Sequence, residues 1–231
     1  QFSNRWENMF REFKILILII FLSVKVFSQT DREFWFVAPE VTVSHYDNVY
    51  YPEFNKTYHG GEPVFFRIST RELPSKVTIS QPANSSFTPI TVNIAANSTQ
   101  SINLTDLGYQ NMVETKYTAG ANNTGIHIES TELITAYYEV YTGNNPEIFS
   151  LKGKNALGTE FYAPFQNQAP NHLWNAPDVR AYHSINIVAT ENNTTVWITP
   201  TKAAHGGHAA GVPFSITLNA GQTYSVCPNN F

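Results

Sequence analysis

The stretch Val212–Val226, VPFSITLNAGQTYSV, repeats the pattern of Thr88–Ile102, TPITVNIAANSTQSI, which lies 124 residues earlier. The two align without a gap, and their apolar positions coincide. Apolar and polar residues alternate in both, as in a strand that buries one face. Gly221 stands where the first copy has Asn97, and these two residue types adopt positive φ in turns most easily. We therefore interpret the stretches as two copies of one β-unit.

Other segments repeat in the same order. RISTRELPSKVTIS (67–80) returns as NIVATENNTTVWIT (186–199), and EFWFVAP (33–39) returns as EFYAP (160–164). The spacing drifts by a few residues, as expected when insertions fall in loops. IHIESTELITAYYEV (126–140) has a similar pattern, so we predict one strand–turn–strand hairpin design used three times.

The fold class follows from short alternating apolar runs separated every 8–12 residues by Asn, Gly, Pro or Ser clusters. We predict an all-β protein of two tandem antiparallel β-sandwich units, Ig-like or jelly-roll-like, covering 29–150 and 151–231. The alternative is a propeller or solenoid built from the hairpins. The second unit ends soon after its repeat, so we expect it to be truncated, with an uncovered sheet edge near Tyr224–Val226.

The N-terminal segment has the features of an export signal. Residues 1–28 comprise a few upstream residues and a predicted signal peptide, Met9–Ser28, in which Arg11 and Lys14 precede the apolar run Ile15–Val24. The run is shorter than the ~20 residues that a spanning helix needs. We predict a secreted or cell-surface protein that does not span the membrane in its mature form; a membrane anchor is the alternative.

Charge and cysteine content exclude other classes. The formal net charge is −4, which argues against nucleic acid as a partner, because such binding needs a clustered basic face. Cys227 is the single cysteine, so no disulfide can form within the chain. Packing alone must stabilise the fold, and we interpret Cys227 as structural or solvent-facing.

Three groups of residues could suggest catalysis or metal binding. His205-Gly-Gly-His208 could share a metal, but zinc sites need three or four ligands, and the chain has neither HExxH nor a cysteine pair. We predict no metal, with His205 and His208 as weak candidates in a Gly-rich loop. The His-Gly-Gly sequence could also suggest the oxyanion loop of an esterase, but the chain has no G-x-S-x-G nucleophile elbow. Glu129, Glu132 and Glu139 could suggest a glycosidase pair, but we interpret them as solvated hairpin positions. We predict no enzyme and no cofactor.

Two long loops, 44–63 and 165–184, are rich in aromatic residues. Loops of this length in compact domains are usually functional or disordered. Tyr and Trp offer a large stacking area with few rotatable bonds, which suits recognition. The alternative is that the rings fold back to cap the sandwich ends. The predicted ligand-binding residues are Tyr46, Tyr50, Tyr51, Phe54, Tyr58, His172, Trp174 and Tyr182.

Six segments between Phe34 and Val226 have distinctive sequence: EFWFVAPEV, RISTRELPSKVTISQPA, ITVNIAANSTQSINLT, NTGIHIESTELITAYYEV, NNPEIFSLKGKNALGTEFYAP and IVATENNTTVWITPT. Together they resemble the IgGFc-binding protein N-terminal domain family. The similarity is closest to versions in large surface or secreted proteins of Bacteroidota, which often carry a gliding-motility-associated, type IX secretion sorting domain. The resemblance implies a secreted or surface binding protein, and it carries no site residues.

The predicted function is an exported adhesion or recognition module that acts without a cofactor. The expected partner is an extracellular glycan, a mucin-like glycoprotein or another surface protein. An accessory fragment of a carbohydrate-active enzyme and a passive stalk that spaces other domains are the alternatives.

Overall fold

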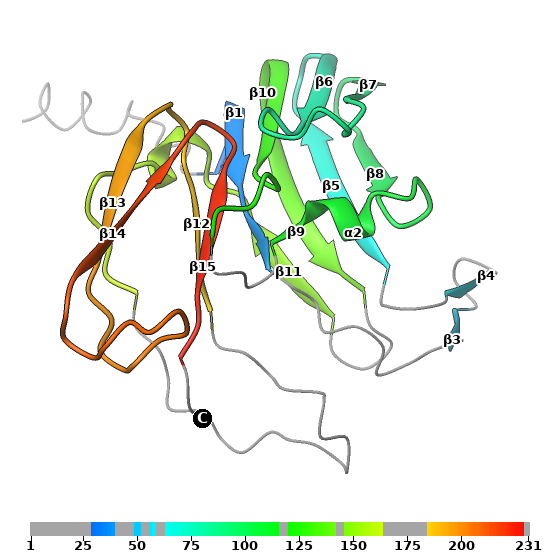
Figure 1. The fold of residues 1–231 in the computed structure, drawn as a ribbon. Coiled ribbons are helices and arrows are strands. Elements are labelled where there is room, and N and C mark those ends of the chain that lie inside the picture. Colours follow the sequence, from blue (N-terminus) through cyan, green and yellow to red (C-terminus); the bar gives the residue numbers. More distant parts are fainter. Residues whose placement is uncertain are drawn as a thin grey trace, which may run out of the picture.

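The computed structural model describes residues 29–39, 49–51, 56–58, 63–115, 120–141, 146–163 and 184–228. Strands dominate this part of the chain (Figure 1), and the all-β prediction is confirmed. The helical elements are single turns: α2 (Gln110–Val113) and the 3-10 turn η1 (Gly153–Ala156). Among the described residues, no helix has the length and apolarity to cross a membrane.

Seven antiparallel strands form one barrel-like sheet around a central 15-residue strand, β10. His127 of β10 pairs with both Trp35 and Ser80, so β1 and β6 lie on opposite sides of β10. The sequence predicted a two-sheet sandwich for this unit, whereas the strands belong to one hydrogen-bonded sheet. Its members are β1 (Asp31–Phe36), β5 (Val64–Thr70), β6 (Ser75–Ser80), β7 (Ile90–Ile94), β8 (Thr99–Asn103), β10 (Ile126–Val140) and β11 (Glu147–Ser150).

The described hairpins differ from the predicted ones. β5 and β6 do not pair with each other; they follow one another along β10, with Ile68 opposite Ala136 and Val77 opposite Ser130. β10 itself continues without a turn. Its buried residues keep the same alternation on both sides of the polar stretch 129–133, so one strand can serve both halves. The hairpin prediction for 126–140 was therefore wrong, because a polar stretch in a long strand has the composition of a turn. The hairpin prediction for 67–80 was wrong because its two strands both pair with β10 and not with each other.

Four two-stranded ladders complete the described structure. Three are antiparallel, and the short β2–β9 ladder is parallel. Two of them, β12–β15 and β13–β14, make up the second unit (Figure 1). The ladders are β2 (Ala38–Pro39) with β9 (Glu114–Thr115), β3 (Val49–Tyr51) with β4 (Lys56–Tyr58), β12 (Ile185–Val188) with β15 (Thr223–Val226), and β13 (Thr194–Ile198) with β14 (Phe214–Leu218).

The second unit has the strand pairing of part of the first. β12, β13, β14 and β15 pair as β5, β6, β7 and β8 do, and β12 and β13, like β5 and β6, do not form a hairpin. The spacing between the two ladders is also the same in both units. From the last pair of one ladder to the first pair of the next, the chain moves six residues forward on one side (β5 to β6, or β12 to β13). On the other side (β8 to β7, or β15 to β14) it moves five residues back. The flanking pairs are Ser69↔Thr99 and Ser75↔Ile94 in the first unit, and Val188↔Thr223 and Thr194↔Leu218 in the second.

The turns agree with this correspondence. Asn97 has φ 51° and Gly221 has φ 78°, so both occupy the left-handed region, as predicted from their alignment. β7 and β14 also show the same order of partly buried, exposed and buried residues. The two units therefore share pairing, register and turn conformation.

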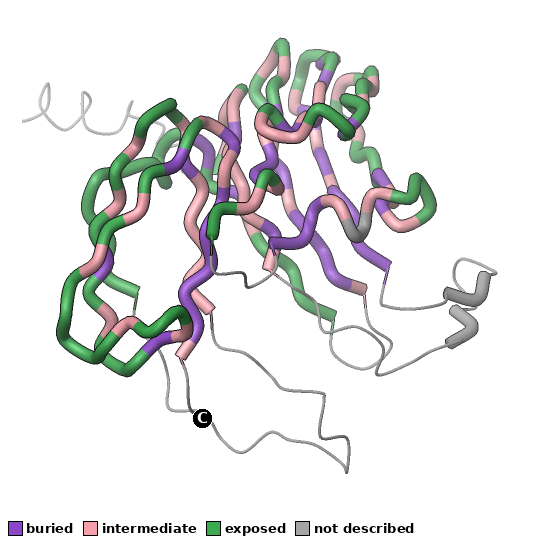
Figure 2. Tube along the Cα trace, in the orientation of Figure 1, coloured by how far each residue is buried: buried purple, intermediate pink, exposed green. Residues whose placement is uncertain are grey.

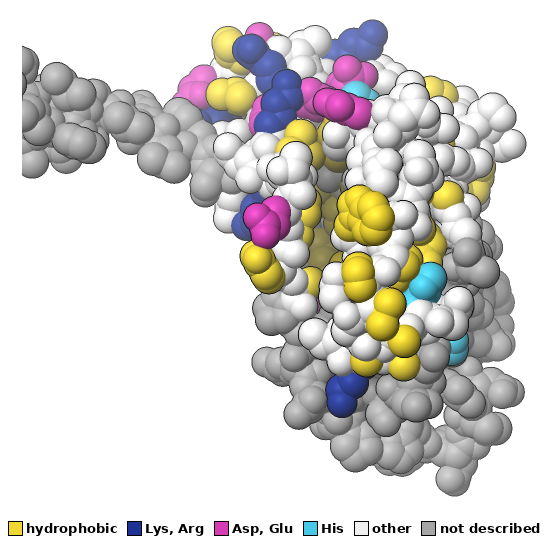
Figure 3. Space-filling view, turned by 60° about the vertical axis from the view of Figure 1, so that its left-hand side comes forward, with side chains coloured by type: hydrophobic (Ala, Val, Ile, Leu, Met, Phe, Trp, Pro, Cys, Tyr) yellow, Lys and Arg dark blue, Asp and Glu magenta, His cyan; other side chains and the backbone are white. Residues whose placement is uncertain are grey.

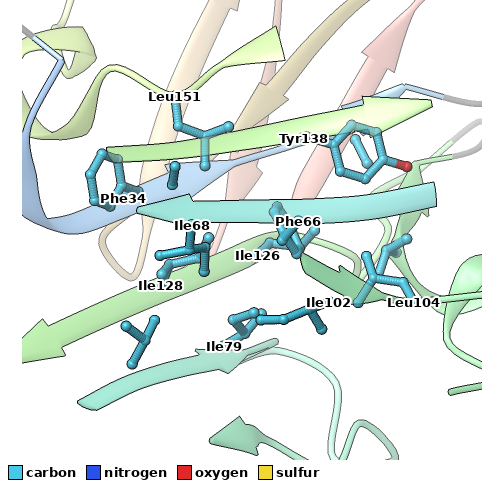
Figure 4. Close-up of a cluster of buried hydrophobic side chains, with 14 of the residues drawn as sticks. Phe34, Phe66, Ile68, Ile79, Ile102, Leu104, Ile126, Ile128, Tyr138 and Leu151 are labelled. Atoms are coloured by element: carbon cyan, nitrogen blue, oxygen red, sulfur yellow. The ribbon is translucent and has the colours of Figure 1, made fainter. Parts of the chain in front are cut away.

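Each unit has its own hydrophobic cluster. The larger one lies under β10 and includes Phe34, Phe66, Ile68 and Tyr138 (Figure 4). The smaller one belongs to the second unit, and its buried members are few (Figure 2). They are Ala189, Ile198, Ala204, Leu218, Tyr224 and Val226.

One contact between the two units is made by β15 and the turn that precedes it. Asn122 and Thr223 exchange two backbone hydrogen bonds of 2.8 Å, and the Gly125 N–H donates to the Gly221 carbonyl at 3.0 Å. All four residues of β15 are buried, as is Cys227. The predicted uncovered edge near Tyr224–Val226 is therefore contradicted in part: these residues are buried, and chain from the first unit pairs with Thr223 next to them.

Candidate functional site

The outward face of β13–β14 carries the most prominent candidate site. Side chains alternate along both strands, so Thr195 and Trp197 of β13 face the same way as Ser215 and Thr217 of β14. The Trp197 side chain is 71% exposed and stands opposite Ser215 in the ladder. The result is a large aromatic ring surrounded by small hydroxyl side chains, here called the Trp197 face.

The inward neighbours explain why Trp197 points outward. Val196 and Ile198 pack in the second core, and period two then places the residue between them in solvent. The corresponding position of the first unit holds Thr78, whose hydroxyl lies 3.3 Å from that of Thr91. The exposed indole is thus specific to the second unit. Trp197 was not among the residues predicted to bind a ligand, although the TVWIT strand was predicted; its outward position in the alternation was the signal for it.

Further exposed apolar residues lie in the same half of the chain. Phe161 and Tyr162 follow η1, and the Tyr162 hydroxyl donates to Glu160 Oε1 at 2.9 Å. Val212 precedes β14 and is also exposed. In Figure 3 the second unit is turned toward the viewer. Hydrophobic side chains lie on this face and inside a hollow in it. Exposed apolar surface gathered in this way marks interaction sites.

Most of the predicted aromatic site falls outside the described residues. For Tyr50, Tyr51 and Tyr58 only the backbone is described: they lie on β3 and β4, where Tyr51 pairs with Lys56 and Tyr58 with Val49. The ligand-binding role of all eight residues stays a prediction. The others, outside the described ranges, are Tyr46, Phe54, His172, Trp174 and Tyr182.

His205 and His208 lie in the loop before β14. The His208 ring stacks on Phe214, with ring centroids 3.5 Å apart and an interplanar angle of 8°. The His205 N–H donates to the Cys227 carbonyl at 2.9 Å. In the described ranges, no group of three or more His, Cys, Asp or Glu side chains is arranged to hold a metal ion. Both histidines have packing or backbone contacts that account for their positions.

The three carboxylates of β10 have separate environments. Glu139 is buried and accepts a hydrogen bond from Arg67 Nε, so its interpretation as a solvated position was wrong. Glu132 Oε2 accepts from Arg32 at 2.6 Å, whereas the Glu129 side chain is 65% exposed. Because β10 continues without a turn, the three carboxylates are spread along the strand. They do not converge on one cavity as a catalytic pair would.

A polar cluster around Glu33 connects β1, β10 and η1. Glu33 accepts hydrogen bonds from the Trp35 indole at 3.1 Å and from Lys154 Nζ at 2.8 Å, and His127 Nε2 lies 3.2 Å away. The Trp35 ring stacks on His127 at 4.1 Å. The Lys154 hydrogen bond lowers the pKa of Glu33 most, outweighing the opposing effect of partial burial. The cluster keeps this carboxylate ionised and positions η1 against β1.

An exposed aromatic ring on a strand ladder is a feature of binding surfaces. Residues 147–229 match the family described as IgGFc binding protein, a family of the binding type. The matched range contains β11, η1, β12 to β15 and the Trp197 face. This agrees in part with the resemblance inferred above, which extended over both units.

The remaining comparisons add little. No curated protein matches the chain. A solved structure described as the crystal structure of Thermotoga maritima 1070 is 14% identical to it. The match covers 53% of this chain and 97% of that chain, with a TM-score of 0.30.

Proposed function

We propose that this chain is an exported, non-catalytic recognition module whose second unit binds a glycan, mucin-like or protein partner through the Trp197 face. The observation that carries the proposal is the exposed indole of Trp197 within the range that matches a binding family. Export to the cell surface or medium is supported by the signal-like segment Met9–Ser28.

The side chains of the Trp197 face can contact either a glycan or a protein partner. An indole contributes a large flat apolar area and one N–H donor with only two rotatable side-chain bonds. Tryptophan is also enriched among the residues that dominate binding energy at protein interfaces. The hydroxyls of Thr195, Ser215 and Thr217 lie on the same face and can bond to sugar hydroxyls or peptide groups.

We further propose that the two units arose by duplication of one β-unit and then diverged. Support comes from the shared pairing, the shared advance of six and five residues, and the matched positive φ of Asn97 and Gly221. At the position of Trp197 the first unit has Thr78, so the proposed recognition role belongs to the second unit. The aromatic loops 44–63 and 165–184 would extend the surface.

The direct test is replacement of Trp197 by Ala, followed by surface plasmon resonance of the chain over two immobilised probes: the Fc fragment of immunoglobulin G and mucin. For whichever probe the native chain binds, we expect W197A to weaken binding at least ~30-fold, the loss typical of a dominant interface residue. The melting temperature should change little, because the side chain is mostly exposed.

The matched control is Leu73→Ala. Leu73 is 57% exposed but lies in the first unit, outside the matched range, so its loss should leave binding unchanged. Binding by W197A equal to that of the native chain would refute the Trp197 face. If Tyr50→Ala, Tyr51→Ala and Trp174→Ala combined abolished binding instead, the loops would be the site. Binding of neither probe would favour the passive stalk.

A further inference from the structure

The outward face of β13–β14 carries no charged side chain. Its exposed residues are Thr195, Trp197, Ser215 and Thr217. The charged residues nearest in sequence are Glu191 and Lys202, which have opposite signs and lie outside the two strands. A charged group that docked on the Trp197 face would lose its water without gaining an opposite charge, so the face favours an uncharged partner.

The hydroxyl groups beside the indole are available to a ligand. Within the described residues, the side chains of Thr195, Ser215 and Thr217 form no hydrogen bond. Thr195 stands opposite Thr217 in the ladder, as Trp197 does opposite Ser215. Neighbouring positions of such a ladder are about 5 Å apart across the strands and about 7 Å apart along them. The face thus combines one stacking surface and several hydroxyl groups within an area similar to that of a hexopyranose ring.

The corresponding face of the first unit has a different chemistry. Lys76 pairs with Asn93 there, and both side chains are exposed. The hydroxyl of Thr78 lies 3.3 Å from that of Thr91. By register, these four residues correspond to those of the Trp197 face. The first unit therefore has a cation and a mutually bonded pair of hydroxyls where the second unit has an indole and unbonded hydroxyls.

The comparison also shows that this face stays open in a unit with more strands. β6 pairs with β10 along its other edge, yet Lys76, Thr91 and Asn93 remain exposed. A strand that joins the edge of a sheet extends the sheet and does not cover its faces. An added strand beside β13 would likewise leave Trp197 in solvent.

We propose that the Trp197 face binds an uncharged hexopyranose residue of an extracellular glycan. The C–H face of the sugar stacks on the indole, and its hydroxyls exchange hydrogen bonds with Thr195, Ser215 and Thr217. A protein partner fits the composition less well, because Ser and Thr are under-represented among the residues that dominate protein interfaces. The inference rests on the function proposed above and names the class of its partner.

The test is saturation-transfer difference NMR of the whole chain with methyl β-D-glucopyranoside and methyl β-D-galactopyranoside. Both sugars present axial C–H bonds on one face of the ring. We expect at least one to bind with a dissociation constant on the order of 1 mM, because a single stacked ring without a pocket binds weakly. The axial ring protons should receive the strongest saturation. Trp197→Ala should abolish the signal, whereas Trp197→Phe, which keeps a flat ring, should weaken binding less than ~5-fold.

The role of charge is tested with methyl β-D-glucuronopyranoside, which has the ring of the glucoside and a carboxylate in addition. The native chain should bind it more weakly than the glucoside, and binding of the glucoside should not depend on salt concentration. Thr195→Lys introduces the residue that the first unit has at this position. This variant should bind the glucuronoside more tightly than the glucoside, because it supplies a cation to the face.

Thr217→Val tests the hydroxyl groups, because valine keeps the branched shape and removes the oxygen. We expect T217V to weaken sugar binding about 2- to 10-fold, the value of one hydrogen bond. The matched control is Thr91→Val on the corresponding face of the first unit, which should leave sugar binding unchanged.

Three outcomes would overturn the proposal: binding of neither neutral sugar, equal binding of the glucoside and the glucuronoside by the native chain, or an undiminished sugar signal in W197A. If W197A loses Fc or mucin binding while neither sugar binds, the recognition face stands and its partner is not a neutral sugar. If W197A binds Fc and mucin like the native chain, the proposed function itself fails.

Discussion

Gly125 shows how closely the two units approach one another. A Cβ built at this position would lie 2.5 Å from the Gly221 carbonyl oxygen and 2.8 Å from Val188 Cγ2. The carbonyl is backbone and already accepts the Gly125 N–H, so it cannot move away without loss of that hydrogen bond. The glycine is required by the contact between β15 and segment 120–125 rather than by an unusual φ.

We predict that Gly125→Ala lowers the free energy of unfolding by about 1–3 kcal/mol, because a methyl group must be forced into a filled space. Urea unfolding followed by circular dichroism measures the change. Gly120→Ala is the matched control, since nothing lies within 4 Å of its Cβ position. Equal stability of the two variants would mean that the units do not pack as described.

Trp197 illustrates what the sequence could and could not predict at this scale. The alternation of TVWIT correctly predicted a strand with Val196 and Ile198 inward. Local pattern alone does not distinguish an exposed tryptophan from one covered by another segment, because the covering chain is distant in sequence. The site can therefore be recognised only from the pairing of β13 with β14, which places Ser215 opposite Trp197.

At the scale of the element, β10 is the strand that organises the first unit. It pairs with four other strands, and its inward residues complete the core (Figure 4). Its continuity could not be predicted, because the stretch 129–133 has the composition of a turn and the partners that hold it extended, β1, β5 and β6, are distant in sequence. The repeated pairing of β5 to β8 and β12 to β15, in contrast, follows the sequence alignment.

Matched substitutions at Ile68 and Ile187 should expose the contribution of β10. Ile68→Ala removes a fully buried side chain and should cost about 2–5 kcal/mol of unfolding free energy. Ile187→Ala, at the corresponding position without a covering strand, should cost only about 1–2 kcal/mol. Denaturant unfolding of both variants measures the difference, and equal losses would contradict the correspondence between the units.

At the scale of the molecule, the two units share one pairing scheme but differ in the strands and side chains that the structure describes. In the first unit β10 pairs with β5 and β6, whereas in the second unit no described strand pairs with the corresponding edges of β12 and β13, and the Trp197 side chain is exposed. Exposed aromatic surface is a feature of interaction sites, so the proposed recognition face lies where the two units differ.

The most direct test of this account is amide hydrogen exchange in the free chain, resolved by residue. Arg67 and Ser69 of β5 should exchange slowly, because β10 accepts their N–H groups. Asn186 and Val188 of β12 should exchange much faster, because the odd-numbered residues of β12 bond to β15 and no described strand pairs with the edge that the even-numbered residues face. Equal protection at the two pairs of positions would show that the edge is already occupied and would contradict the account.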